Sequence, residues 1–271
     1  MNEKDDSQAV AQYYDSQAER EWQRMERHRM EFGISLRSLK RHLPPPPARI
    51  ADIGGGPGRY AIELAREGYR VTLADLSLGN VALARAKAEE AGVKLEDCRQ
   101  VNALDLSGFE TAGYDAVLLM GPLYHLLERE QRLLAVREAL RLLRPGGVLA
   151  ASFITRYAPF REGALNDLGW VFEDFPYALR LLRTGIHDKQ AGFTRAHFAH
   201  VSEVQPLMCE AGLDQIALVG CEGFCAELES LANALQGARW EQWLDINEEA
   251  ANDPAALAMA DHLLYIGRKP G

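Results

Sequence analysis

The stretch that decides the fold is IADIGGGPGRYAIELA, residues 50–65. Its first residues are apolar enough for a buried strand, and its last eight have the apolar spacing of a helix. The glycines between them permit a sharp turn and a close approach of the backbone to a ligand. A strand, a glycine-rich turn and a helix in this order predict a site for a nucleotide-like cofactor, and several cofactors use such turns.

Strands and helices alternate on both sides of this stretch. We predict strands at residues 48–53, 69–75, 94–101, 114–120, 147–154, 214–220 and 262–269. We predict helices between the early strands at residues 58–67, 77–91 and 128–143. This alternation is typical of an α/β fold with a doubly wound, mostly parallel sheet that helices cover on both faces.

Two segments fall outside the alternation. Residues 1–43 are predicted to form an N-terminal helical lid segment, and LPPPP at 43–47 is a stiff hinge because four prolines cannot continue a helix. Residues from about 155 to 201 are rich in aromatic side chains and arginine, which predicts a helical cap insertion. We therefore expect a lid segment followed by one domain at 48–271 that carries the cap.

Composition narrows the possible partners. The 271 residues suit one large domain, and the net charge of −9 disfavours nucleic acid and anionic membranes. The four cysteines form neither a disulfide framework nor a CxxC zinc motif, so we predict no metal. The chain lacks a run of about 18 apolar residues and an apolar signal core at its start. We expect a cytoplasmic protein, a monomer or homodimer, with a small-molecule substrate.

The glycine turn fits two kinds of cofactor by its letters alone. GPGRYA at 56–61 matches the dinucleotide fingerprint GxGxxA, and Asp75 lies about 20 positions on, where an acidic residue binds ribose. Asp52, however, stands at the end of the first strand, where its carboxylate would repel a pyrophosphate. A cofactor with an ammonium and a sulfonium would be attracted, and the helix N-terminus would bind its carboxylate.

Five motifs in register resemble those of the class I S-adenosylmethionine-dependent methyltransferases. ADIGGGPGRYAIELA resembles the first motif of this family, VTLADLS the second, NALDL the third and YDAVLLMGPLYHLL the fourth. LRLLRPGGVLAASF resembles the helix, turn and fifth strand that follow, and HLLYIGRK the last strand. The resemblance spans residues 48–154 and implies a seven-stranded Rossmann-like sheet with S-adenosylmethionine as the cofactor.

The resemblance also implies a role for each motif residue. Asp52 would lie near the methionine ammonium, and Gly54 and Gly56 would make room for the methionine and the ribose. Asp75 would accept both ribose hydroxyls, although such a residue can also be an ordinary helix cap. The remaining implied contacts are Leu76 on the adenine, Asn102 at the adenine amino group in place of the usual Asp, the Ala103 N–H at an adenine nitrogen, and the Met120 carbonyl at the ammonium.

Four residues outside these contacts are further candidates. Tyr14 offers an aromatic face that suits a sulfonium, and Arg29 would pair with the cofactor carboxylate unless it only belongs to a solvated charged helix. His125 directly follows the fourth strand and is the preferred catalytic base, with Tyr124 beside it as a second candidate. The alternative for His125 is that it only orders its loop.

Aromatic side chains of the cap are predicted to cover the substrate. The candidates are Tyr157, Trp170, Phe172 and Tyr177. The alternative is that some of them form the core of the cap itself.

The leading interpretation is a secondary-metabolism enzyme that moves the sulfonium methyl to an O, N or C nucleophile of a small molecule. A second possibility is cyclisation of S-adenosylmethionine to azetidine-2-carboxylate with release of methylthioadenosine. Two others are a non-catalytic cofactor-binding regulator and a nicotinamide-dependent oxidoreductase. The sequence motifs indicate which cofactor binds, but they do not indicate which molecule accepts the methyl group.

Overall fold

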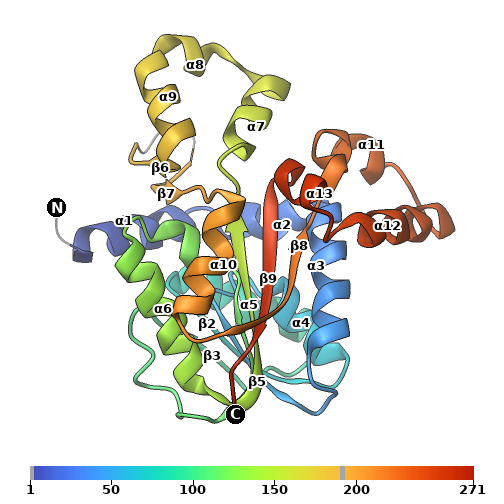
Figure 1. The fold of residues 1–271 in the computed structure, drawn as a ribbon. Helices are drawn as coiled ribbons and strands as arrows, with labels where there is room; N and C mark the ends of the chain where they lie inside the picture. The colour runs from blue at the N-terminus through green and yellow to red at the C-terminus, as the bar shows by residue number, and fades with distance from the viewer. Residues whose placement is uncertain (1–2, 190–192) are drawn as a thin grey trace.

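A seven-stranded sheet forms the centre of the molecule (Figure 1). The computed structural model describes residues 3–189 and 193–271. The strands are β1 (Arg49–Ile53), β2 (Arg70–Asp75), β3 (Asp97–Gln100), β4 (Tyr114–Leu119), β5 (Leu143–Ile154), β8 (Asp214–Gly220) and β9 (His262–Arg268). Their order is β3-β2-β1-β4-β5-β9-β8, and β9 runs antiparallel to both of its neighbours, β5 and β8, whereas the other pairs are parallel. The predicted α/β fold with a mostly parallel, seven-stranded Rossmann-like sheet is confirmed.

Helices cover both faces of this sheet. They are α3 (Arg29–His42), α4 (Arg59–Arg66) and α5 (Leu78–Glu90) on one face, and α6 (Arg129–Leu142) and α10 (Val201–Glu210) on the other. Alternate residues of one strand serve the two cores, since Ile50 packs with the first group and Ala51 and Ile53 with the second. Burial on both sides explains why the central strands are apolar throughout.

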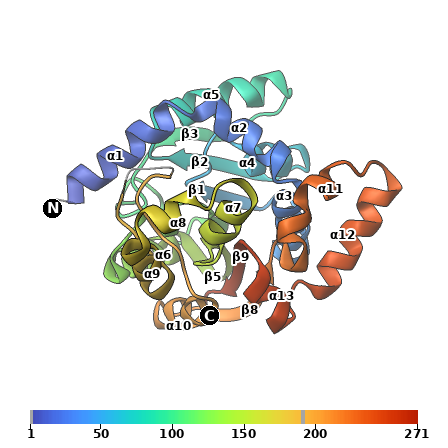
Figure 2. The same ribbon diagram turned by 90° about the horizontal axis from the view of Figure 1, so that it is seen from above.

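The N-terminal segment consists of three helices where the sequence predicted one helical stretch. These are α1 (Glu3–Asp15), α2 (Ala18–Arg27) and α3, and the chain is interrupted at residues 16–17 and at His28. The buried side chains of Met30 and Ile34 fix α3 to the sheet core. By contrast, α1 and α2 run beside α5 at the carboxyl-terminal end of the sheet (Figure 2). Residues 1 and 2 of the predicted lid segment lie outside the described residues.

The predicted cap follows β5. It consists of α7 (Ala158–Asn166), α8 (Gly169–Glu173), α9 (Phe175–Thr184) and the short strands β6 (Ile186–His187) and β7 (Ala196–His197). These elements rise beyond the end of β5 (Figure 1). Residues 190–192 of the predicted cap lie outside the described residues.

A second helical insertion separates β8 from β9. It contains the 3-10 helix η2 (Gly223–Leu228), α11 (Glu229–Asn233), α12 (Ala238–Ala250) and α13 (Pro254–Met259). Leu244 of α12 packs against Gly33 of α3. A Cβ added at Gly33 would lie only 3.0 Å from the Cδ2 atom of Leu244. This insertion therefore supports α3 and, through it, the N-terminal segment.

The start of β5 differs from the prediction. The turn expected at RPGG is the irregular beginning of the strand, with a register shift in its pairing between Tyr114 and Ala116 of β4. Gly147 makes this possible, because an added Cβ there would lie 2.9 Å from the carbonyl oxygen of Arg144. Within residues 3–189 and 193–271, no helix is both long and apolar enough to cross a membrane.

Candidate active site

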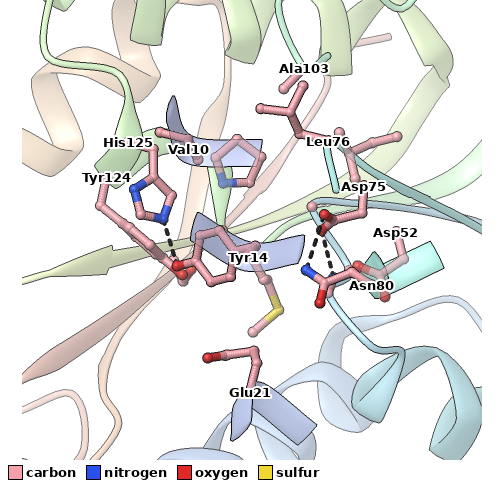
Figure 3. Close-up of a pocket in the computed structure, with 18 of the residues that line it drawn as sticks. Val10, Tyr14, Glu21, Asp52, Asp75, Leu76, Asn80, Ala103, Tyr124 and His125 are labelled. Carbon is pink, nitrogen blue, oxygen red and sulfur yellow. Dashed lines mark hydrogen bonds between the residues drawn. The ribbon is translucent and has the colours of Figure 1, made fainter. Parts of the chain in front are cut away.

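A pocket lies where β1, β2 and β4 end, the edge at which open α/β sheets bind ligands (Figure 3). The lining residues from the strand ends and the loops after them include Asp52, Gly54, Gly56, Asp75, Leu76, Asn102, Ala103, Met120, Tyr124 and His125. The lining residues from α1 and α2 are Ser7, Val10, Tyr14, Glu21 and Arg24. The structure thus brings together all the predicted cofactor and catalytic residues except Arg29.

The glycine turn after β1 requires glycine for two separate reasons. Gly54 has a φ of +75°, in the left-handed region that side chains rarely adopt. A Cβ at this position would also lie 2.4 Å from the Cδ atom of Pro122. The Gly54 N–H donates to the Ala74 carbonyl at 2.7 Å, which ties the turn to β2. The turn therefore lies directly against the segment after β4, leaving no room for a side chain.

Asp75, the last residue of β2, organises the loops around it. Its Oδ2 atom accepts from the Gly56 N–H at 2.8 Å, and its Oδ1 atom accepts from the Ser77 N–H at 2.9 Å and the Asn80 amide at 3.2 Å. Figure 3 shows Asn80 turned toward this carboxylate. Ser77, not Asp75, caps α5, since its hydroxyl accepts from the Asn80 N–H. The ordinary-cap alternative for Asp75 therefore does not describe its position.

Asp52 is a buried carboxylate without a partner. Its residue surface is only 1% exposed, and neither carboxylate oxygen has a hydrogen bond within the described part of the chain. Burial, and then the charge of Asp75, raise the pKa of Asp52 to about 7. Because leaving a buried polar group unpaired is costly, such an atom points to a missing ligand. The geometry fits a cationic group placed beside Asp52.

The loop after β3 supplies the side of the pocket beyond Asp75. Asn102 and Ala103 line it together with Leu76. The Asn102 side-chain oxygen accepts from the Leu104 N–H at 3.0 Å, and its amide nitrogen lies 3.4 Å from the Ser7 hydroxyl of α1. An amide oxygen has a second lone pair, so Asn102 can still accept another hydrogen bond.

His125 and Tyr124 belong to η1 (Pro122–His125), the 3-10 helix after β4. The Nε2 atom of His125 lies 2.8 Å from the Tyr14 hydroxyl, and its Nδ1 atom lies 3.3 Å from the Arg195 carbonyl oxygen. Burial lowers the pKa of His125 to about 4, although the bond to Arg195 opposes this shift. Burial also raises the pKa of Tyr14 and of Tyr124. The pocket therefore holds a neutral imidazole next to two neutral phenols.

Known proteins resemble the chain over this same region. The family model "Methyltransferase domain" matches residues 50–147. A ubiquinone biosynthesis O-methyltransferase of Methylocella silvestris is 38% identical over 54% of the chain and 56% of the relative. The ubiquinone biosynthesis O-methyltransferase of Dinoroseobacter shibae is 32% identical over 69% of the chain and 66% of the relative. The chain belongs to the class I S-adenosylmethionine-dependent methyltransferase family.

The fold comparison agrees with this family. A solved structure described as a methyltransferase, a possible histamine N-methyltransferase from Thermotoga maritima, superposes with a TM-score of 0.60. It is 17% identical, and the match covers 94% of the chain and 98% of that structure. S-adenosylmethionine is the cofactor of this family. The matches to the two curated relatives span 56% and 66% of their length.

The pocket also contains a partly buried ionic network that sequence reasoning missed. Arg24 donates to Glu21 at 2.8 Å and to Glu31 at 2.6 Å. His262, at the start of β9, lies 2.6 Å from a Glu222 oxygen and 3.8 Å from a Glu31 oxygen. The network joins α2, α3, β9 and the residue before η2, and Arg24, Glu21, Glu31 and His262 line the pocket.

The opposite charges of this network shift the pKa values of its members. Although burial opposes a charged imidazole, the carboxylates of Glu31 and then Glu222 raise the pKa of His262 to about 9. Against its own burial, Glu31 has a lowered pKa because of Arg24. The oxygens of Glu31 and Glu222 and a ring nitrogen of His262 lie within 4.8 Å of one another, as metal ligands could, but a cation there would have to displace these ion pairs. No local sequence signal pairs residues so far apart along the chain.

The prediction for Arg29 is wrong. Its guanidinium donates to the carbonyl oxygens of Asn233 at 2.7 Å and Leu235 at 3.2 Å, and it lies 4.0 Å from the ring centre of Trp240. Arg29 begins α3 and points toward the second insertion, so it is absent from the residues that line the pocket. The arginine that does reach the pocket is Arg24, on α2.

The substrate role predicted for the cap aromatics is also not supported by their positions. Among the described residues that line the pocket, none is Tyr157, Trp170, Phe172 or Tyr177. Tyr177 is buried in the cap core, where its hydroxyl bonds to His187, and Trp170 packs partly buried against Phe160. Phe172 is 72% exposed and Tyr157 is 36% exposed. The alternative of a cap core thus describes Trp170 and Tyr177, since their rings pack on one another and not on the pocket.

Proposed function

We propose that this chain transfers the methyl group of S-adenosylmethionine to an oxygen atom of a small molecule. The observation that carries the proposal is the buried, unpartnered carboxylate of Asp52 beside the glycine turn. A dinucleotide would bring its pyrophosphate to this carboxylate, whereas S-adenosylmethionine brings an ammonium. The curated relatives are named O-methyltransferases, which supports oxygen as the acceptor atom.

The residues at the strand ends would hold the cofactor. Asp52 would accept a hydrogen bond from the ammonium, and the Met120 carbonyl would accept a second one. A carboxylate offers about four acceptor positions, of which protein donors take three at Asp75. The open position, and the long bond from Asn80 that a ligand can replace, leave room for the ribose hydroxyls. Leu76, Asn102 and Ala103 surround the adenine.

The protein's share of the chemistry is position and the exclusion of water. When bound, S-adenosylmethionine supplies an electrophilic methyl group on a sulfonium. The chain has to hold the acceptor oxygen in line with that methyl group, because alignment supplies much of the rate in such a displacement. In Figure 3, Tyr14 lies between the Asp75 side of the pocket and His125. We place the acceptor on the His125 side, where Tyr124, Ser152 and Arg195 also line the pocket.

We further propose that residues 1–43 act as the lid of a domain spanning 48–271. Five residues of α1 and α2 line the pocket, so these helices cover part of the ligand site. The cap insertion would contribute mainly through Arg195, which directly precedes β7 and lines the pocket. This assignment gives the cap a smaller share of the site than its aromatic composition predicts.

Ligand binding is the first test of the proposal. We expect S-adenosylhomocysteine to raise the melting temperature of the protein and NADH to leave it unchanged, since a ligand that binds the folded state stabilises it. Stabilisation by NADH alone would overturn the cofactor and the reaction together.

Product analysis is the second test. The protein is incubated with S-adenosylmethionine alone and then with a panel of phenols, carboxylic acids and amines, and the products are identified by mass spectrometry. We expect S-adenosylhomocysteine and a methylated phenol. Methylthioadenosine formed without an acceptor would instead identify the cyclisation to azetidine-2-carboxylate. Binding without any product would identify a regulator.

A further inference from the structure

The contact between Tyr14 and His125 joins the N-terminal segment to the loop after β4. Tyr14 is in α1 and His125 in η1, and their hydroxyl oxygen and Nε2 atom are 2.8 Å apart (Figure 3). Both residues line the pocket. Their rings meet edge to face with centres 5.3 Å apart, and Phe193 and Tyr124 pack on other sides of the imidazole.

The second contact of His125 decides where its proton sits. The Nδ1 atom lies 3.3 Å from the Arg195 carbonyl oxygen, and a carbonyl can only accept a hydrogen bond. In the neutral imidazole Nδ1 must then carry the hydrogen, and Nε2 has a free lone pair. Tyr14 consequently donates its hydroxyl hydrogen to Nε2, and its oxygen keeps lone pairs that can accept from a third group.

We propose that Tyr14 and His125 form a proton relay in which Tyr14, not His125, is the catalytic residue that touches the acceptor. The inference rests on the methyl transfer to oxygen proposed above. As the acceptor oxygen bonds to the methyl carbon and the carbon–sulfur pair stays on sulfur, the acceptor O–H gives its proton to the Tyr14 oxygen. Tyr14 passes its own proton to Nε2, which leaves an imidazolium bonded to the Arg195 carbonyl.

Three features of the pocket favour this route. Both ring nitrogens of His125 already have partners, so a proton reaches Nε2 through the Tyr14 hydroxyl. The low pKa of His125 keeps the imidazole neutral and able to accept a proton at neutral pH. A weak base suffices because the acceptor oxygen becomes strongly acidic as it is methylated. The other titratable groups that face the pair are Tyr13, Tyr124, Glu21, Arg24 and Arg195.

The relay depends on how α1 is seated. Asp15, next to Tyr14, accepts from the Ser77 hydroxyl at 2.5 Å and from the Gly79 N–H at 2.9 Å at the N-terminus of α5. Those contacts fix the end of α1 that carries Tyr14. The proton acceptor is therefore complete only when the N-terminal helices cover the pocket, so transfer and exclusion of water are coupled.

The pH profile of turnover tests the relay. The variants are Tyr14→Phe and His125→Gln, and Tyr13→Phe is the matched control, because Tyr13 is the neighbouring tyrosine and does not line the pocket. With a phenol that the wild type methylates, we expect kcat to fall about 10²- to 10⁴-fold at pH 7 in the first two variants, the usual effect of losing acid–base catalysis. Wild type and the control should be independent of pH between 7 and 9.

The slope of the profile separates a relay from a merely structural role. Without the relay the phenol must ionise before it reacts, and a phenol has a pKa near 10. The rate of Tyr14→Phe and His125→Gln should therefore rise about tenfold per pH unit between 7 and 9. A structural defect would lower the rate equally at every pH. Equal loss at every pH, or unchanged kcat in Tyr14→Phe, would overturn the relay while methylation by the wild type still upheld the proposed function.

A measurement without turnover completes the test. In the complex with S-adenosylhomocysteine, ¹⁵N-histidine NMR should show His125 with its hydrogen on Nδ1 at pH 7, the His125→Gln spectrum identifying its signals. Tyr14→Phe removes a bond to the neutral form, so the pKa of His125 should rise, and Tyr13→Phe should not change it. Hydrogen on Nε2 in the wild type, or an unchanged pKa in Tyr14→Phe, would contradict the relay whatever the acceptor is.

Discussion

The strand ends and the cap of this molecule differ in whether their polar side chains have hydrogen-bond partners. At the end of β1 the carboxylate of Asp52 is buried with no partner among the described residues. In the cap, His187 bonds to the Tyr177 hydroxyl and, at 3.1 Å, to the Phe193 carbonyl, and Lys189 pairs with Asp174 at 2.6 Å. A buried carboxylate without a partner is costly to ionise until a ligand completes it, whereas a closed network needs no ligand. The difference supports the proposal that the first region binds a ligand and the second is scaffold.

The largest effect is expected at Asp75, which holds both the loops and, as proposed, the ribose. Asp75→Ala should weaken S-adenosylhomocysteine binding at least about 100-fold, because each hydrogen bond to a charged group contributes about 1.5–3 kcal/mol and tenfold in affinity is 1.4 kcal/mol. Isothermal titration calorimetry measures the change. Asp105→Ala is the control, since Asp105 is exposed and outside the pocket. Equal affinities of the two variants would show that Asp75 does not bind the ribose.

Gly54 tests whether the turn is built around backbone strain and close contact. Gly54→Ala should lower the free energy of unfolding by about 2–5 kcal/mol, combining the left-handed backbone with the overlap on Pro122. Gly92→Ala is the matched control, because Gly92 has a φ of +66° and no atom within 4 Å of its added Cβ. It should lose only about 1–2 kcal/mol. Urea denaturation that gives equal losses would mean that the contact with Pro122 is unimportant.

The strand ends and the cap also show which parts of a structure can be predicted from sequence. The predicted cofactor residues of the sheet lie at the end of a parallel strand or in the loop after it, and the topology alone brings such strand ends to one edge. The spacing of Asp52, Gly54 and Asp75 along the chain therefore predicts their proximity. The sheet itself was predictable for the same reason, since strands buried on both faces are apolar runs separated by helices.

Side chains on helices outside the sheet lack this constraint. Arg24 and Arg29 lie five positions apart in a polar segment, and the break at His28 sends their side chains to different places. Aromatic residues in the cap were equally compatible with a substrate surface and with a small core of its own. His262 meets Glu31 only because β9 enters the sheet next to β5, a tertiary fact that no local pattern carries.

Asp52 provides a pH-dependent test of intermediate size. In the ligand-free protein its pKa is about 7, so the carboxylate that attracts an ammonium is mostly formed only above that value. Affinity for S-adenosylhomocysteine should rise about tenfold from pH 6 to pH 8, with proton release on binding at the lower pH. Asp52→Asn should bind more weakly and show no such rise. Calorimetry in buffers of different ionisation enthalpy counts the protons, and a pH-independent affinity of the wild type would contradict the prediction.

The same group should affect the stability of the free protein in the opposite sense. The folded-state pKa of Asp52 lies above its unfolded value of 3.8, so its contribution is fully present below that value and is lost as the pH rises through about 7. At pH 8, ligand-free Asp52→Asn should therefore be more stable than the wild type, by on the order of a few kcal/mol. At pH 4 the two should differ little. A variant that is less stable at pH 8 would mean that Asp52 has a partner.

The smallest effect is expected in the cap, at the most exposed of the predicted substrate residues. Phe172→Ser should leave the KM for the acceptor and kcat unchanged, because Phe172 is 72% exposed and does not line the pocket. Its stability should change by less than about 0.5 kcal/mol, as for most surface positions. A rise in KM without a change in melting temperature would mean that the cap closes over the acceptor and that the comparison with the strand ends has to be redrawn. An unchanged KM would support selection of the acceptor by the residues that line the His125 side of the pocket, Arg195 of the cap included.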